Sequence, residues 1–148
     1  MKIEIRKINP EETFVLRQKI LRPNQTLNDC QYSGDLEKSS SHFGAFANNK
    51  QIGIASIYNQ NEKGEIEEGI WRIRGMAVLE EFRGSEIGAK LLQSCIKYAK
   101  SQNAKNVWCN GRSTVVGFYS KFGFSPKGEE FEIEGIGPHF VMEINLQK

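Results

Sequence analysis

The sequence has few of the features that mark membrane, secreted or metal-binding proteins. No apolar run is longer than a few residues, and residues 52–57 are typical, so we expect no segment that spans a bilayer. The first ten residues lack the apolar core of a signal peptide. The three cysteines, Cys30, Cys95 and Cys109, show no Cys-x-x-Cys spacing, and only two histidines occur. These absences predict a reduced, cytoplasmic protein and argue against a histidine-rich metal site.

An excess of one charge is also missing. The chain has 20 basic and 18 acidic residues, a net charge of +2, which is too close to neutral for the concentrated basic face of a nucleic-acid-binding domain. Hydrophobic residues make up 39% and charged residues 26%, the balance of a folded globular protein. The 148 residues suit one domain spanning positions 1–148.

The hydrophobic pattern predicts alternating strands and helices. Strands are expected over residues 3–8, 71–79, 107–109, from 124 onward and over 140–144, with a hairpin over 42–58 that turns at 47–50. Helices are expected over 10–21, 86–100 and 114–122. Residues 22–41 have no sustained period and are interpreted mainly as a surface excursion. The order of elements predicts a mixed α/β sandwich with helices on both faces of a sheet.

Residues 78–89 join a buried strand to a strongly amphipathic helix through a short loop. The first N–H groups of such a helix have no partner within the helix, and its dipole places positive charge in the loop. Phosphates bind well in this setting, where Gly84 and Gly88 allow close approach of the backbone and Arg83 adds a positive charge. An ordinary strand–loop–helix connection, with glycines that only ease packing, would have the same pattern.

A second segment accompanies the first: Asn110-Gly111-Arg112, followed by residues 117–124, which read Gly-Phe-Tyr-Ser-Lys-Phe-Gly-Phe. Together the two segments resemble motifs A and B of the GNAT superfamily of acyl-CoA-dependent N-acyltransferases. In that superfamily the phosphate loop reads Arg/Gln-x-x-Gly-x-Gly/Ala, and a later helix carries Phe-Tyr-x-Lys-x-Gly-Phe. The resemblance covers residues 71–124 directly, and residues 21–24, 41–45 and 128–139 look like one bacterial branch of the superfamily.

The resemblance implies both a fold and a function. The fold is a mixed, mostly antiparallel central sheet with helices on both faces and splayed central strands. The function is N-acetyl transfer from acetyl-CoA to a primary amine, by direct attack in a ternary complex and without a metal. A homodimer is also expected from the superfamily. The acceptor is open: a small amine, an amino acid, an aminoglycoside-like molecule or a protein amine.

The resemblance also implies roles for individual residues. The strand end at Met76, Ala77 and Val78 would pair with the pantetheine arm and supply an N–H to the thioester carbonyl. Asn110 would help to hold the pantetheine, and Tyr119 would protonate the departing thiolate. Backbone N–H groups of the loop and first helical turn would cradle the CoA pyrophosphate; this set comprises Arg83, Gly84, Ser85, Glu86, Ile87, Gly88 and Ala89.

One residue departs from the family pattern. Glu86 occupies the position where the phosphate loop usually has its first glycine. Its carboxylate would repel a nearby pyrophosphate, although a glutamate in the first helical turn also complements the helix dipole. The departure predicts weaker CoA binding.

Several residues have a structural alternative. Tyr119 could be a half-buried aromatic whose hydroxyl is tied to a neighbour. His139, in a glycine-rich turn before the last strand, is a candidate base or a hydrogen-bonded structural histidine, and His42 has a similar pair of interpretations. Arg112 could position a ligand or form a salt bridge. The acidic groups at 62–68 and 129–134 could attract a cationic amine or be solvated loops.

Two other functional classes compete with the enzyme. One is a non-catalytic acyl-CoA-binding module, which the glutamate in the phosphate loop favours. The other is an unrelated nucleotide-binding domain, against which the sequence lacks both a Lys-Ser/Thr pair after its glycine loop and a full Gly-x-Gly-x-x-Gly.

Overall fold

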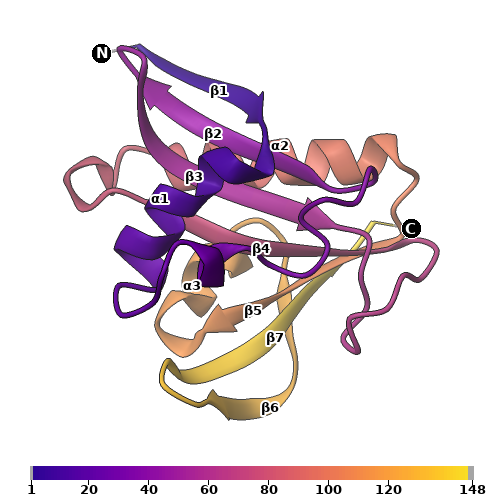
Figure 1. Cartoon of the computed structure of the whole chain (residues 1–148). Coiled ribbons are helices and arrows are strands. Elements are labelled where there is room, and N and C mark those ends of the chain that lie inside the picture. Colours follow the sequence, from indigo (N-terminus) through magenta and orange to yellow (C-terminus); the bar gives the residue numbers. More distant parts are fainter. Residues whose placement is uncertain (1, 147–148) are drawn as a thin grey trace.

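The computed structural model describes residues 2–146 and contains one seven-stranded sheet (Figure 1). The strand order is β1-β2-β3-β4-β5-β7-β6, and every neighbouring pair is antiparallel except β4 and β5, which are parallel. The strands are β1 (Ile3–Ile8), β2 (Ser41–Ala47), β3 (Lys50–Tyr58), β4 (Ile70–Val78), β5 (Asn106–Arg112), β6 (Ser125–Ile133) and β7 (Gly137–Asn145). The predicted mixed, mostly antiparallel sheet is confirmed.

Helices cover both faces of this sheet (Figure 1). The long helix α2 (Ile87–Ser101) packs on β1 to β4 and buries Ile87, Leu91, Leu92, Cys95 and Ala99, while α1 (Phe14–Leu16) lies on the opposite face. The buried side chains of α2 recur every three to four residues, which is the spacing that predicted the helix. The short helix α3 (Val116–Ser120) packs beside β5, β6 and β7.

The first helix is less regular than the pattern predicted. A 3₁₀ turn over Pro10–Thr13 leads into α1, and a π-helical turn over Arg17–Leu21 ends the segment. The predicted start is confirmed, because the Glu12 carboxylate accepts a hydrogen bond from the Asn9 N–H at 2.8 Å. The wide last turn is closed by a hydrogen bond from the Arg22 N–H to the Arg17 carbonyl at 2.9 Å. Arg17 points into the interior and is fully buried, which no apolar period could reveal.

Most of residues 22–41 are exposed, in agreement with the interpretation as mainly a surface excursion, but the segment is anchored at a few buried positions. The segment holds only a short 3₁₀ turn, Asn28–Cys30, yet Cys30, Tyr32 and Asp35 are buried. Asp35 forms a hydrogen-bonded ion pair with Arg17, and this pairing anchors the loop against the sheet. The sequence shows no hydrophobic period here because the anchor is polar.

The hairpin between β2 and β3 turns where it was expected. Asn48 and Asn49 both adopt left-handed backbone conformations, with φ of 51° and 67°. A two-residue turn of this kind matches the twist of the flanking strands, and asparagine tolerates it well.

Candidate active site

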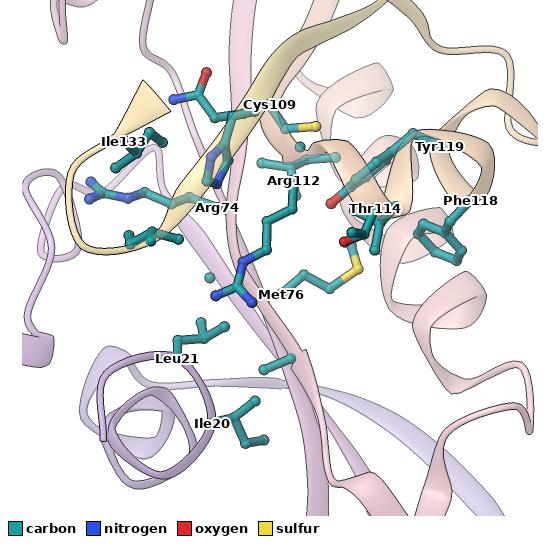
Figure 2. A pocket seen from close by; sticks show the side chains of 18 of the residues that line it. Ile20, Leu21, Arg74, Met76, Cys109, Arg112, Thr114, Phe118, Tyr119 and Ile133 are labelled. Atoms are coloured by element: carbon teal, nitrogen blue, oxygen red, sulfur yellow. The ribbon is translucent and has the colours of Figure 1, made fainter. Parts of the chain in front are cut away.

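The two parallel strands at the centre of the sheet separate partway along their length. Pairing between β4 and β5 is restricted to Ile70–Arg72 and Asn106–Trp108, although the strands continue to Val78 and Arg112. β5 remains paired with β7 along its whole length, so the opening lies on its β4 side. A cavity of about 800 Å³ fills this opening (Figure 2). The predicted splay of the central strands is therefore present.

A bulge in β4 directs the end of this strand toward the cavity. Ser56 and Ile54 of β3 pair with Arg74 and Ala77, so two steps on β3 match three on β4. The bulge contains Gly75, with φ of +70°, where an added Cβ would lie 3.2 Å from the Tyr32 ring. Glycine meets both the conformational and the spatial requirement. Met76 also lies within the bulge, and its side chain points into the cavity (Figure 2).

Tyr119 of α3 lines the same cavity, and its hydroxyl points into it (Figure 2). The residue is only 8% exposed, and its ring packs against Phe124 and Phe118 at centroid distances of 5.6 and 5.2 Å. Burial raises the pKa of the phenol well above its usual value, and the adjacent Cys109 side chain adds to this. Tyr119 is therefore a protonated hydrogen-bond donor at neutral pH, held in place by its ring.

The loop before α2 has the backbone geometry that its glycines predicted. Gly84 has φ of +83°, and α2 begins at Ile87 with no side chain capping its first N–H groups. Glu86 itself adopts a left-handed conformation, with φ of +66°. This explains the glycine that the family places here, because only glycine adopts this conformation without strain. Glu86 is exposed.

The structure brings half of the predicted site residues into one cavity and places the others beside it. Those that line the cavity are Met76, Ala77, Val78, Arg83, Asn110 and Tyr119. The remainder form the loop and first turn of α2: Gly84, Ser85, Glu86, Ile87, Gly88 and Ala89. The Ile87 side chain is buried against the sheet, so only its backbone can reach a ligand.

Sequence reasoning missed three arginines and a tyrosine that also line the cavity. These are Arg22, Arg72, Arg74 and Tyr32. The signal for two of them was present, because the alternation Trp71-Arg72-Ile73-Arg74 places both arginines on one face of β4. No pattern identified the other two, which come from the loop after the first helix.

The two histidines occupy different places. His139 is buried, lines the cavity and bonds the Gly137 carbonyl through Nδ1 at 2.7 Å. His42 lies outside the cavity lining and contacts Ser56 and the Asp35 carbonyl, at 2.7 and 3.0 Å. Burial lowers the pKa of His42, which keeps its ring neutral. For His42 the structural interpretation accounts for both ring nitrogens.

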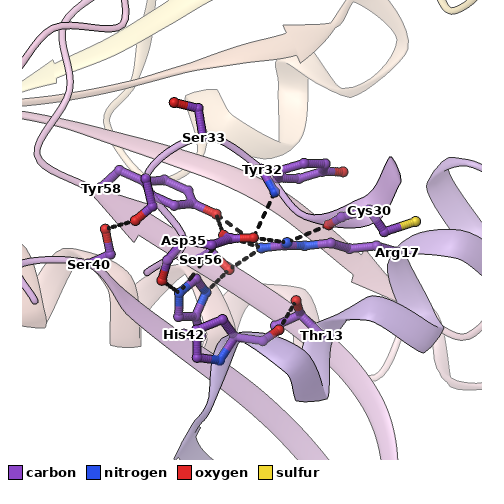
Figure 3. A network of polar contacts seen from close by, with 12 residues as sticks. Thr13, Arg17, Cys30, Tyr32, Ser33, Asp35, Ser40, His42, Ser56 and Tyr58 are labelled. Atoms are coloured by element: carbon purple, nitrogen blue, oxygen red, sulfur yellow. Dashed lines mark hydrogen bonds and ion pairs between the residues drawn. The ribbon is translucent and has the colours of Figure 1, made fainter. Parts of the chain in front are cut away.

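A buried polar network supports the cavity from the first-helix side (Figure 3). Arg17 donates to Asp35 at 2.7 and 3.1 Å, and to the Ser56 and Tyr58 hydroxyl oxygens at 3.0 Å each. Asp35 also accepts from the Tyr58 hydroxyl and from the Tyr32 N–H at 2.7 Å. The network therefore ties the first helix and the following loop to β3, and it fixes Tyr32 at the edge of the cavity.

Within residues 2–146, no three His, Cys, Asp or Glu side chains come together in a way that could hold a metal ion. None of the helices in that range is both long and apolar enough to cross a membrane.

Comparisons with known proteins agree with this geometry. The family model "Acetyltransferase (GNAT) domain" matches residues 11–146. An uncharacterized N-acetyltransferase of Bacillus subtilis, YitI, is 38% identical over 145 residues, covering 98% of this chain and 97% of the relative.

Solved structures show the same fold at lower identity. The crystal structure of Escherichia coli ElaA aligns with a TM-score of 0.76 and 21% identity, covering 97% of this chain and 100% of that one. An aminoglycoside 6′-N-acetyltransferase complexed with coenzyme A aligns with a TM-score of 0.77 and 11% identity, over 98% of both chains. The family match and the Bacillus relative identify the protein: it belongs to the GNAT family of acetyltransferases.

Proposed function

We propose that the protein transfers the acetyl group of acetyl-CoA to a primary amine by direct attack in a ternary complex. The observation that carries this proposal is the opening between β4 and β5, which holds a neutral phenol beside the bulged end of β4. Such an opening offers unpaired strand edge to an extended ligand and a hydrogen-bond donor to a leaving group.

In this proposal the donor enters from the α2 side of the opening. The backbone of residues 83–89 binds the pyrophosphate, supported by the helix dipole and by Arg83, which is exposed and donates its Nε–H to the Val78 carbonyl at 3.2 Å. The pantetheine arm pairs with the free edge of β4 at Met76, Ala77 and Val78, with Asn110 of β5 on its other side. This arrangement brings the thioester close to Tyr119.

The chemistry then follows in two steps. A neutral amine attacks the thioester carbonyl, and the C–N bond forms as a backbone N–H of the β4 end stabilises the oxyanion. The tetrahedral intermediate collapses, the C–S bond breaks and the thiolate leaves. Tyr119 donates a hydrogen bond, and then its proton, to the sulfur. The proton lost by the amine nitrogen restores the phenol, directly or through water, so the products are the amide and free CoA.

An acetyl-cysteine intermediate is disfavoured by the same structure. Cys109 is the cysteine that lines the cavity, and burial raises the pKa of its thiol to about 12. Burial also raises the pKa of Cys95. Both side chains are therefore thiols rather than nucleophilic thiolates at neutral pH, which favours direct attack by the amine.

The test compares Tyr119→Phe with Tyr98→Phe. Tyr98 lies on α2 outside the cavity lining and donates its hydroxyl to the Ser39 carbonyl at 2.7 Å, so it controls for the loss of a tyrosine hydroxyl. We expect Tyr119→Phe to lower kcat by about 100-fold with unchanged acetyl-CoA binding by calorimetry, and Tyr98→Phe to keep its kcat. Full activity of Tyr119→Phe would remove the acid role. Absence of acetyl-CoA binding to the unmodified protein would remove the proposed function.

The compartment and the assembly remain proposals. We propose a reducing, cytoplasmic location, supported by three buried cysteines that are all free. The homodimer stays a prediction from the family resemblance, and sedimentation equilibrium would measure it.

A further inference from the structure

The charges that line the cavity are all of one sign. Arg22, Arg72, Arg74, Arg83 and Arg112 contribute to its walls, and among the described residues no Asp or Glu does so. The acidic residues on either side of Ile133, at positions 132 and 134, are exposed and lie outside the lining.

Three of these arginines, Arg22, Arg72 and Arg74, lie against aromatic rings instead of carboxylates. The Arg74 and Arg22 guanidinium groups lie 4.1 and 5.6 Å from the centre of the Tyr32 ring, and that of Arg72 lies 4.8 Å from the Trp108 ring. No ion pair within residues 2–146 involves any of the three. Arg72 donates from Nη1 to the Gln60 side-chain oxygen at 3.4 Å, while its buried Nε has no hydrogen-bond partner.

The positive charge is poorly compensated where these side chains lie. Burial, followed by repulsion from Arg74, lowers the pKa of Arg72 to about 10. Burial likewise lowers the pKa of Arg74, and Arg22 is among the groups that repel it. Partly desolvated arginines without a carboxylate partner cost folding free energy, and an anion bound in the cavity would account for their presence together.

The CoA phosphates are not that anion in the proposed binding mode. The pyrophosphate loop follows the C-terminal end of β4, whereas Arg72 and Arg74 precede the bulge on the same strand. At about 3.3 Å per residue, they lie roughly 13 and 7 Å before Met76, away from the loop. Arg74 also lies across the cavity from Tyr119 and Phe118 (Figure 2). Arg72, Arg74 and Arg22 therefore surround the acceptor side of the thioester.

We infer that the acceptor is an anionic amine, with a carboxylate or phosphate that binds Arg22, Arg72 and Arg74 while its amine faces the thioester. This inference rests on the proposed acetyl transfer and names the acceptor class. Guanidinium groups bind carboxylates and phosphates through paired N–H donors, which also fixes the orientation of the amine. A polycationic acceptor would be repelled by the same residues.

The arrangement also helps the chemistry. An amine near pKa 10 is mostly an ammonium ion at neutral pH and cannot attack. Nearby positive charges disfavour the ammonium form and so increase the fraction of neutral amine. The arginines thus bind the anionic end of the acceptor and favour the reactive form of the other end.

The test uses matched acceptor pairs with CoA-saturated protein. Calorimetry compares phenylalanine with phenylalaninamide for a carboxylate, and glucosamine 6-phosphate with glucosamine for a phosphate, with spermidine and kanamycin as polycations. We expect one anionic member to bind at least about 10-fold more tightly than its mate, since hydrogen bonds between charged groups contribute about 1.5–3 kcal/mol. The pair whose two members differ in affinity identifies the anion as a carboxylate or a phosphate. Transfer assays should show the same preference in kcat/KM.

Variants locate the effect. Arg72→Gln and Arg74→Gln should each weaken the anionic acceptor by about 10- to 100-fold, without changing acetyl-CoA affinity. Lys97→Gln, an exposed residue of α2 with the same charge change, is the control and should match the unmodified protein. Arg83→Gln should instead weaken acetyl-CoA alone.

The outcomes separate this inference from the function on which it rests. The acceptor class is overturned if neither anionic probe binds more tightly than its mate, or if neither probe binds at all. In that case, binding of acetyl-CoA still preserves the proposed function. Loss of selectivity in Lys97→Gln as large as in the arginine variants would overturn the assignment to this cavity. Failure of the unmodified protein to bind acetyl-CoA refutes the proposed function itself.

Discussion

Replacing Asp35 by asparagine should destabilise the protein more than any comparable change in its loop. The Arg17 and Asp35 side chains are both fully buried, with Nη1 and Oδ2 2.7 Å apart. The amide of Asp35→Asn would leave the Arg17 charge uncompensated. It would also place an amide N–H donor against the N–H donors of the Arg17 guanidinium group. Removing one partner of a buried ion pair costs about 3–5 kcal/mol, out of a total unfolding free energy of about 5–15 kcal/mol.

That cost corresponds to a large change in melting temperature. For a chain of this size, each kcal/mol lowers Tm by roughly 2–4 °C, so we expect a decrease of about 6–20 °C. Because replacing both buried charges is often nearly neutral, Arg17→Met combined with Asp35→Asn should recover much of the loss. Glu37→Gln makes the same chemical change at an exposed position of the same loop and should stay within about 0.5 kcal/mol.

The pH dependence gives an independent readout. Burial alone would raise the pKa of Asp35, but hydrogen bonds from Arg17 and Tyr58 outweigh it and hold the pKa below its usual value. The carboxylate therefore contributes stability that is present above about pH 3.9 and is lost as pH falls through the lower folded pKa. This acid-dependent loss should be absent from Asp35→Asn.

Urea denaturation of the four proteins at neutral and acidic pH makes the measurement, with the slope m checked for two-state behaviour. A single Asp35→Asn change that costs less than about 1 kcal/mol, the value of an ordinary hydrogen bond, would refute the reasoning. So would a double variant no more stable than the single one. Because the Asp35 carboxylate binds the Tyr32 N–H, the single variant should also raise the acceptor KM.

Two further predictions concern charge and protonation elsewhere in the chain. The left-handed backbone at Glu86 is strained with or without ligand, whereas its charge acts only on bound CoA. Glu86→Gln should therefore tighten CoA binding by about 2- to 5-fold, because the Coulomb repulsion is removed. Glu86→Gly should give the same gain and should also relieve the backbone strain. CoA affinities of both variants equal to that of the unmodified protein, measured by calorimetry, would contradict this prediction. Burial lowers the pKa of His42, so the protein should lose stability as pH falls from about 6.5 toward that lower value. His42→Gln should make the urea midpoint less dependent on pH over this window. An unchanged dependence of the midpoint on pH would assign the titration to another group.

Local patterns predicted most of the fold and the loop that precedes α2. The apolar stripe of α2, the Asn48-Asn49 turn and the glycine loop at 84–88 are each encoded within a few consecutive residues. Such features depend on backbone propensity and one buried face, which a linear sequence displays directly. The positions of Tyr119 and Asn110 in one cavity were predicted only through the family resemblance.

The arginine-lined part of the cavity depended on contacts between distant segments. Asp35 reads as an ordinary loop aspartate until Arg17, 18 residues earlier in the chain, is seen to neutralise it. Polar anchors carry no hydrophobic period, so neither the π-helical turn nor the burial of Cys30, Tyr32 and Asp35 was visible in the sequence. The local sequence by itself determined the strands, the long helix and the glycine loop before it. Only the tertiary structure brought Arg22 and Tyr32 beside Arg72 and Arg74, because that arrangement requires a network joining segments far apart in the chain.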